Sequence, residues 1–199
     1  MATDATYRKN FLVHTHQLDS VLNSKPPVRS ALPPQYTIPI VVHVIHLGEP
    51  VGTGSNISDA QILDAINGLN ERFANSNGQG LDCEIDFCLA TQTPDGCPTN
   101  GINRVDGSGV PGYATEGIRY NTPCGADEAA IKELSRWSPL DYYNVWVVLD
   151  ICGDWAGYAQ FPNGGDLDGT VIGKDFMNGD AKTLVHELGH GLNIRHTFN

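Results

Sequence analysis

Basic residues are scarce in this chain, and long apolar runs are absent. Its 199 residues include 12 Lys and Arg against 23 Asp and Glu, which gives a formal net charge of -11. A surface of this sign repels phosphate backbones and anionic lipid headgroups, so we expect neither nucleic acid nor a membrane as a partner. No apolar run approaches the roughly 18 to 20 residues that span a bilayer. The length suits one globular domain of ordinary size behind a short leader.

The first residues, MATDATYRKN, also lack the apolar segment of a secretory signal peptide. Five cysteines, together with many Gly and Pro residues, nevertheless favour an oxidising compartment, and none of them has the CxxC spacing of zinc or redox sites. Because five is odd, one thiol lacks a partner inside the chain. We expect a secreted (extracellular) protein with disulfide bonds, from which a leader was removed or in which none existed.

The composition of residues 1–36 differs from that of the rest of the chain. The stretch LNSKPPVRSALPPQY contains two Pro-Pro pairs, which favour extended polyproline structure and offer few donors for regular structure. We interpret residues 1–36 as a leader or pro-segment with a Pro-rich linker, and residues 37–199 as the folded domain.

Helices and strands are expected in mixed order along that domain. TIPIVVHVIHL, residues 37–47, is β-branched and nearly all apolar, as is typical of a strand buried on both faces. Residues 58–73 predict an amphipathic helix, which begins with a capping box formed by Ser58 and Gln61. The other patterns predict strands at 83–90, 143–151, 157–162 and 170–173, a helix at 127–137, and a helix that carries Leu184 onward and is capped by Asp180. This mixture predicts an α+β fold, with the helix 58–73 backing the sheet.

Near the end of the chain, the stretch VHELGHGLNIRH places His186 and His190 four residues apart. On a helix these imidazoles share one face one turn apart, at a spacing that can bind a single zinc ion. Glu187 is adjacent in sequence to a ligand but off their line, so its carboxylate can reach a metal-bound water as a general base. The HExxH pattern is short enough to occur by chance on a solvated helix face, so it does not decide the function by itself.

His196 adds a third imidazole six residues beyond His190, too far round the helix to share its face. It can reach the metal only if the helix ends and the chain reverses. Asn193 tolerates the positive φ that such a turn requires. The opposite helix face is apolar and is expected to pack on the core (Val185, Leu188, Leu192). We therefore expect His186, His190 and His196 to bind Zn2+.

The segment HELGHGLNIRH resembles the extended zinc motif HExxHxxGxxH of the metzincin metallopeptidases. Most of residues 36–199 is similar to the pappalysin (cytophagalysin-like) family, through YTIPIVVHVIH, ISDAQILDAINGLNERF, IDFCLATQTPDGCPTNGINR, YYNVWVV, GYAQFP and LVHELGHGLNIRHTF. Asn193 stands where the family motif usually has Gly, which the turn argument allows. Metzincins also have a lower subdomain with a methionine-containing turn beyond the third histidine, whereas both methionines here, Met1 and Met177, precede the motif.

The resemblance implies a zinc endopeptidase that hydrolyses protein or peptide substrates. Residues 37–199 would be the catalytic upper subdomain, a twisted mixed sheet with a backing helix and an active-site helix, with the lower subdomain missing. In similar enzymes the strand corresponding to GYAQFP forms the upper rim of the cleft and pairs with an extended substrate. The resemblance therefore implies substrate-binding roles for Ala156, Gly157, Tyr158 and Ala159, and an ordinary edge strand is the alternative.

Two other functions stay open. The chain could be an inactive zinc-binding fragment, because the cleft lacks its lower half. It could also be a secreted binding module in which zinc is purely structural. A structural site is expected to have four protein ligands, and no Cys or fourth His lies near Arg195 to complete one.

Other polar groups suggest weaker hypotheses. GGDLDG, residues 164–169, offers acidic oxygens suited to calcium, but it lacks the acidic count and the final glutamate of an EF-hand loop. His43 and His46 lie in the apolar strand and are expected to be hydrogen-bonded core or edge residues. A leader that blocks the zinc would use an oxygen or nitrogen ligand, because no cysteine precedes Cys83; a leader without an inhibitory role is the alternative. The candidates for that ligand are Asp4, Asp19, His14 and His16.

Overall fold

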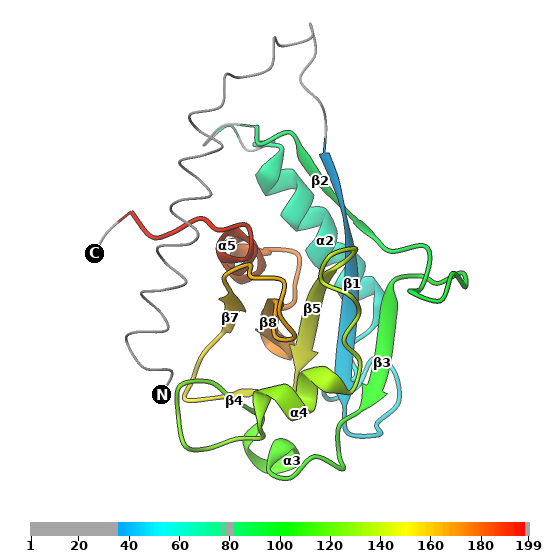
Figure 1. The fold of residues 1–199 in the computed structure, drawn as a ribbon, viewed down its shortest axis with the longest axis vertical. Helices are drawn as coiled ribbons and strands as arrows, with labels where there is room; N and C mark the ends of the chain where they lie inside the picture. Colours follow the sequence, from blue (N-terminus) through cyan, green and yellow to red (C-terminus); the bar gives the residue numbers. More distant parts are fainter. Residues whose placement is uncertain (1–35, 77, 79–81, 198–199) are drawn as a thin grey trace, which may run out of the picture. The chain divides into compact units, whose positions relative to one another are not determined.

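The computed structural model describes residues 36–76, 78 and 82–197. The leader expected at residues 1–36 lies outside this part except for Tyr36, and so do the candidate blocking residues in it. The described part is built on a six-stranded sheet with helices on both faces (Figure 1). None of its helices is long and apolar enough to cross a membrane.

The parallel part of the sheet is organised around strand β1 (Tyr36–His46). One edge of β1 pairs first with β2 (Ile85–Leu89) and then, further along, with β3 (Ile102–Asp106). The other edge pairs with β5 (Tyr143–Val148), and all three pairings are parallel. Residues 40–45 of β1 are buried because apolar cores cover both faces of the sheet, which explains the nearly continuous apolar run of its sequence, whereas Tyr36 at its start is exposed.

The sheet ends in an antiparallel strand. Strand β8 (Gly169–Gly173) lies parallel to β5, and β7 (Gly157–Gln160) pairs with β8 in the opposite direction. Figure 1 shows the order β3, β1, β5, β8 and β7 across the sheet. Among the described residues no strand pairs with the other side of β7, which is therefore an open edge along which backbone groups can pair with another extended chain.

Helices α2 (Asp59–Phe73) and α5 (Lys182–Gly191) share one apolar core with the same face of the sheet. The opposite face packs against α3 (Tyr113–Glu116), α4 (Glu128–Glu133) and the short strands β4 (Ile118–Arg119) and β6 (Ile151–Cys152). A 3-10 turn, η1 (Lys174–Phe176), follows β8. Each large apolar side chain buried in these cores contributes about 1.5 to 3 kcal/mol. The α+β class, the mixed sheet and the backing helix predicted from the sequence are confirmed.

Several predicted boundaries were wrong. The strand expected at 143–151 is interrupted after Val148, where Asp150 turns its carboxylate to accept a hydrogen bond from the Ile151 N–H. The helix expected at 127–137 ends at Glu133. Strand β3 was not predicted at all, because its residues are only half-buried and mix polar with apolar side chains.

One of the two hydrogen bonds of the capping box predicted for α2 is present. The Ser58 hydroxyl accepts a hydrogen bond from the Gln61 N–H at 3.1 Å, as predicted. The Gln61 side chain does not return to Ser58 but donates to the carbonyls of Lys174 at 3.1 Å and Met177 at 2.8 Å. A contact distant in sequence thus replaces the local one and ties α2 to the segment that leads into α5.

The prediction that Asp180 caps α5 was wrong. The residue before the helix is Ala181, in a left-handed conformation with φ 50°, and no side chain caps the first turn. The Asp180 carboxylate instead accepts from Arg72 at 2.7 Å and pairs with Lys182 at 2.8 Å. Ion pairing between the end of α2 and the start of α5 therefore takes the place of a cap.

His43 is a fully buried member of the sheet, as expected of a hydrogen-bonded core residue. Its Nε2 lies 2.9 Å from Oδ1 of Asn144, its Nδ1 lies 3.3 Å from the side-chain amide of Asn103, and its ring stacks on Trp146. The partners of these nitrogens fit a neutral ring that donates from Nε2 and accepts at Nδ1. Burial lowers the pKa of His43 from 6.5 to about 4, and the hydrogen bond to Asn144 opposes that shift.

We expect the low pKa of His43 to make the fold sensitive to acid. Between the unfolded value of 6.5 and the folded value of about 4, the unfolded chain binds one more proton at this residue than the folded chain. The stabilisation is complete above pH 6.5 and is lost as the pH falls, by about 2 kcal/mol at pH 5. Denaturant unfolding of wild type and His43→Gln at pH 7 and pH 5 measures it, and equal pH dependence in the two proteins would contradict the assignment.

Candidate active site

The three histidines predicted to bind zinc converge on one point. His186 and His190 lie one turn apart on α5, and their Nε2 atoms are 3.2 Å apart. The Nε2 of His196 lies 3.1 Å from each of them. A neutral imidazole carries one N–H, so three Nε2 atoms that face one point cannot all be hydrogen-bonded to one another. A cation at that point could instead accept the lone pairs of all three nitrogens.

The turn after α5 brings His196 back to the helix. Asn193 has φ 70°, in the left-handed region, as the sequence predicted. Its N–H donates to the carbonyl of His190 at 2.9 Å, and the N–H of Ile194 donates to the carbonyl of Gly189 at 2.8 Å. These two bonds form a Schellman motif, which satisfies the last carbonyls of the helix while reversing the chain.

The carbonyl of Ile194 also orients His190. It lies 2.8 Å from Nδ1 of His190, so that nitrogen bears the proton and Nε2 is left bare for a metal. The ring of Phe161 lies 5.5 Å from that imidazole, and the guanidinium of Arg195 lies 5.4 Å above the Phe161 ring. Sequence reasoning missed this contact of Phe161, which links the end of β7 to the histidines.

The C-terminal end of α5 packs directly against the sheet at Gly191. A Cβ added at Gly191 would lie 1.7 Å from the hydroxyl of Tyr143, which shares a hydrogen bond of 2.7 Å with Thr170. Only glycine fits this approach, and nothing in the sequence pattern indicated it. The predicted apolar face of the helix is confirmed, because Leu188 is buried in the core and Val185 and Leu192 pack against it.

Glu187 lies between the histidines and the edge strand β7. Burial raises the pKa of Glu187, while the nearby His190 and a hydrogen bond from the backbone of Ala159 act in the opposite direction. The group of side chains close enough to share a metal contains the three histidines and not Glu187. The pKa of His186 is lowered by burial and by the charges of the neighbouring histidines, which favours the neutral form that a metal requires.

The four residues expected to bind substrate belong to the edge strand or directly precede it. The carbonyl of Ala156 accepts from the Gly173 N–H at 3.0 Å, so its pairing is inside the sheet. Given this register, the backbone of Tyr158 faces β8, whereas the backbone groups of Gly157 and Ala159 point to the open edge. The Ala159 N–H on this edge already donates to the Glu187 carboxylate, so the groups that face an added strand are those of Gly157 and the carbonyl of Ala159.

The loop considered for calcium, residues 164–169, is held by its own hydrogen bonds. One carboxylate oxygen of Asp168 accepts from the N–H groups of Asn163 at 2.9 Å and Gly164 at 2.5 Å. Asp166 pairs with Arg136 at 3.4 Å. In the described ranges, the only other group of potential metal ligands beside the histidines contains Cys124 and Cys152, which form a disulfide. Calcium at this loop stays a prediction.

Comparison with known proteins gives the class of protein to which the chain is similar. No protein-family model matches it. It is 26% identical over 207 aligned positions to the "Extracellular metalloprotease" of Arthroderma benhamiae, covering 97% of this chain and 62% of that protein. It is 25% identical over 187 positions to the protein of the same name from Arthroderma otae, covering 87% and 57%. The chain thus spans about three fifths of the length of these relatives.

The fold is similar to that of mirolysin. Mature mirolysin of Tannerella forsythia, solved in complex with a cleaved peptide, matches 83% of this chain and 66% of its own, with a TM-score of 0.65 and 31% identity. A promirolysin mutant of the same organism matches 98% of this chain and 66% of its own, with a TM-score of 0.70 and 27% identity. These similarities support a relationship to the metalloproteases.

Proposed function

We propose that the chain is the zinc-binding part of a secreted metalloendopeptidase of the metzincin class, close to the pappalysins. In this proposal His186, His190 and His196 hold Zn2+ and Glu187 is the general base. The main support is the convergence of the three Nε2 atoms, each 3.1 to 3.2 Å from the others. The alternative of an inactive zinc-binding fragment differs in activity and not in this geometry.

The histidines fit zinc in number and in spacing. Nitrogens that lie about 2.0 to 2.1 Å from one tetrahedral zinc are about 3.3 Å apart, close to the separations found here. A structural zinc usually has four protein ligands, whereas catalytic zinc keeps one position open. In the part of the chain that the structure describes, the cluster contains three side chains and no fourth. This count favours a catalytic site over a structural one.

In this proposal Glu187 moves a proton during peptide hydrolysis. A bound zinc would supply Lewis acidity, which lowers the pKa of water to about 7 and polarises a peptide carbonyl. The Glu187 carboxylate then takes the proton from water as the oxygen adds to the carbonyl carbon. It returns that proton to the amide nitrogen as the C–N bond breaks, so no covalent enzyme intermediate forms.

The open edge of β7 supports a role in substrate binding. An extended peptide that adds to this edge would pair with the backbone of Gly157 and the carbonyl of Ala159, and main-chain hydrogen bonds of this kind bind peptides without demanding a particular sequence. The hydrogen bond from Ala159 to Glu187 supports this arrangement, because it keeps the proposed base beside the same edge. The bond to be cleaved would therefore lie between the strand and the histidines.

We also propose that residues 1–36 are a pro-segment. The match to the promirolysin mutant extends over 98% of this chain, whereas the match to mature mirolysin covers 83%. A synthetic peptide of residues 1–36 should inhibit an active form that lacks them, and inhibition should weaken on Asp4→Ala or Asp19→Ala if a carboxylate is the blocking ligand. No inhibition up to millimolar peptide would contradict an inhibitory leader.

A peptidase assay of the zinc-loaded chain tests the proposed function. We expect cleavage of an unstructured protein such as casein, loss of that cleavage when a chelator removes the metal, and recovery when zinc is restored. If the chain binds one zinc and cleaves nothing, the inactive-fragment alternative replaces the endopeptidase. If it binds no zinc, both are wrong.

A further inference from the structure

Two partly exposed aromatic side chains lie beside the edge strand. The ring of Tyr120 stacks on that of Tyr158 in β7, with centroids 4.0 Å apart and planes 10° apart. The indole of Trp155 meets Tyr120 edge to face at 5.5 Å. Tyr158 is buried, whereas Trp155 is 46% exposed and can contact a ligand. We call Tyr120 and Trp155 the aromatic wall.

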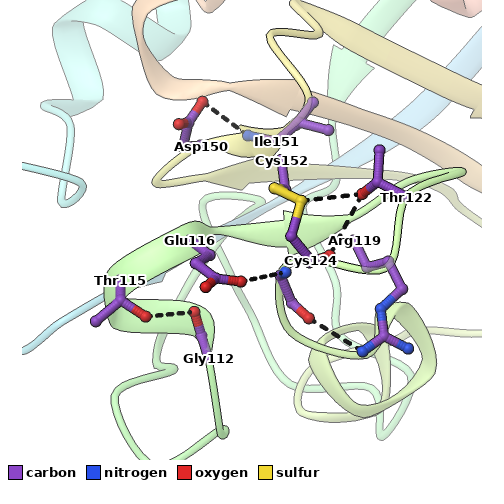
Figure 2. The surroundings of a disulfide bond; sticks show 10 residues. Gly112, Thr115, Glu116, Arg119, Thr122, Cys124, Asp150, Ile151 and Cys152 are labelled. Carbon is purple, nitrogen blue, oxygen red and sulfur yellow. Dashed lines mark hydrogen bonds between the residues drawn. A yellow bond between two sulfur atoms is a disulfide. The ribbon is translucent and has the colours of Figure 1, made fainter.

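The aromatic wall is held by a disulfide. The disulfide between Cys124 and Cys152 joins the segment after Tyr120 to the turn before Trp155. Figure 2 shows the hydrogen bond between the Thr122 hydroxyl and the sulfur of Cys124 beside this disulfide. Gly153 has φ 104°, a conformation that favours glycine, and a Cβ there would lie 3.2 Å from the indole nitrogen of Trp155, so another residue would strain the backbone and push the indole outward. The wall is therefore preorganised, and a ligand would lose little entropy in ordering it.

The aromatic wall adjoins the candidate active site. Tyr158, on which Tyr120 stacks, is the residue before Ala159, and Ala159 bonds to Glu187. Burial raises the pKa of Tyr120, and the charge of Glu187 is the next cause, which agrees with this proximity. Trp155 directly precedes Ala156 and the open edge of β7. A peptide along that edge would pass beside both rings.

The charge of Glu128, one of the carboxylates that act on Tyr120, is compensated. Glu128 pairs with Lys132 at 2.8 Å, and Lys132 is fully buried. The Lys132 ammonium also donates to the carbonyl of Leu167 at 2.7 Å and lies 5.5 Å from the Tyr158 ring. With its carboxylate already paired, Glu128 does not favour a cationic side chain there.

The direction of β7 shows which part of a substrate would meet these rings. A strand that adds to β7 in the favoured antiparallel sense runs from the Ala159 end towards Trp155. If the bond to be cleaved lies beside Glu187, residues on its C-terminal side extend towards the wall. We propose that Tyr120 and Trp155 form a subsite for a large apolar or aromatic side chain, one to three residues beyond the cleaved bond. This inference rests on the proposed peptidase function.

Matched peptides test the subsite. A fluorogenic peptide is made with Phe, Ala or Lys at each of these positions, and kcat/KM is measured for wild type, Trp155→Ala, Tyr120→Leu and Leu63→Ala. Leu63 is a matched control, because it is 48% exposed and lies on α2, which packs on the other face of the sheet. At one position we expect Phe to exceed Ala by about tenfold in wild type and Leu63→Ala, and by less than about threefold in the two wall variants.

A binding measurement separates this inference from the proposed function. If no peptide is cleaved, the peptidase proposal fails, and titration of Trp155 fluorescence or chemical shifts with the same peptides then decides the subsite. We expect the Phe peptide to bind about tenfold more tightly than the Ala peptide. Equal binding of Phe and Ala, a preference for Lys, or an unchanged Phe preference in both folded wall variants would overturn the subsite.

Discussion

Glu187→Gln is expected to retain zinc and to lower kcat/KM for peptide cleavage by at least about 10³-fold. Glutamine keeps the shape and the hydrogen-bond acceptor that faces the Ala159 amide, but it cannot accept the proton of the attacking water. Loss of a general base costs about 10² to 10⁴-fold, and here the same group also returns the proton to the leaving amine. Steady-state kinetics and zinc analysis of the same preparation measure both effects.

Glu133→Gln is the matched control for this variant. Glu133 is an exposed glutamate at the end of α4, and its replacement should leave activity unchanged. If zinc is lost from Glu187→Gln, Glu187 binds the metal directly and the assigned role is wrong. Full activity of Glu187→Gln would mean that another group serves as the base.

His196→Ala is expected to weaken zinc binding by more than about 100-fold and to abolish cleavage. Loss of a partner that merely orients a ligand already costs about 10 to 100-fold in metal affinity, so loss of a ligand itself should cost more. The substitution should leave α5 and the Asn193 turn intact, because the two backbone hydrogen bonds of the turn and the bond from His190 to the Ile194 carbonyl do not use the His196 side chain. Competition with a chelator of known affinity measures the change.

His46→Ala separates this effect from the loss of any partly exposed histidine. Its imidazole lies at the end of β1 and accepts from the Gly48 N–H at 2.9 Å, away from the cluster of three. We expect the His46→Ala variant to bind zinc with the affinity of wild type. Unchanged zinc affinity in His196→Ala would show that the chain reversal after α5 does not serve metal binding.

The sequence was most informative where function depends on local spacing. The pair His186 and His190 needs only the helical period, and the turn at Asn193 needs only a residue that tolerates positive φ. Both are properties of a few neighbouring residues, so they could be predicted without knowing the fold. The strands β1, β7 and β8 were predicted for the same reason, from β-branched or alternating patterns that each persist over several residues.

Contacts between distant segments could not be predicted in this way. The Gln61 side chain bonds to Lys174 and Met177, although a local capping pattern was available to it. Asp180 pairs with Arg72 and not with the start of α5. These side chains obey ordinary hydrogen-bond and charge rules, but their partners become available only once the sheet has brought α2 and α5 together.

The requirement for glycine at residue 191 is a tertiary effect of the same kind. It follows from the hydroxyl of Tyr143, a residue on β5 that is almost fifty positions earlier in the chain. The aromatic wall likewise depends on the Cys124–Cys152 disulfide, whose pairing the cysteine spacing did not reveal. The roles of the residues that hold or flank the site could therefore not be predicted from the sequence, whereas the candidate metal ligands could.

The most direct test of the account is X-ray diffraction from zinc-loaded crystals of the chain, recorded on both sides of the zinc absorption edge. The account predicts a single strong anomalous peak about 2.0 to 2.1 Å from Nε2 of His186, His190 and His196, with the Glu187 carboxylate outside the ligand sphere. A peak elsewhere, or no peak at these histidines after exposure to zinc, would contradict it.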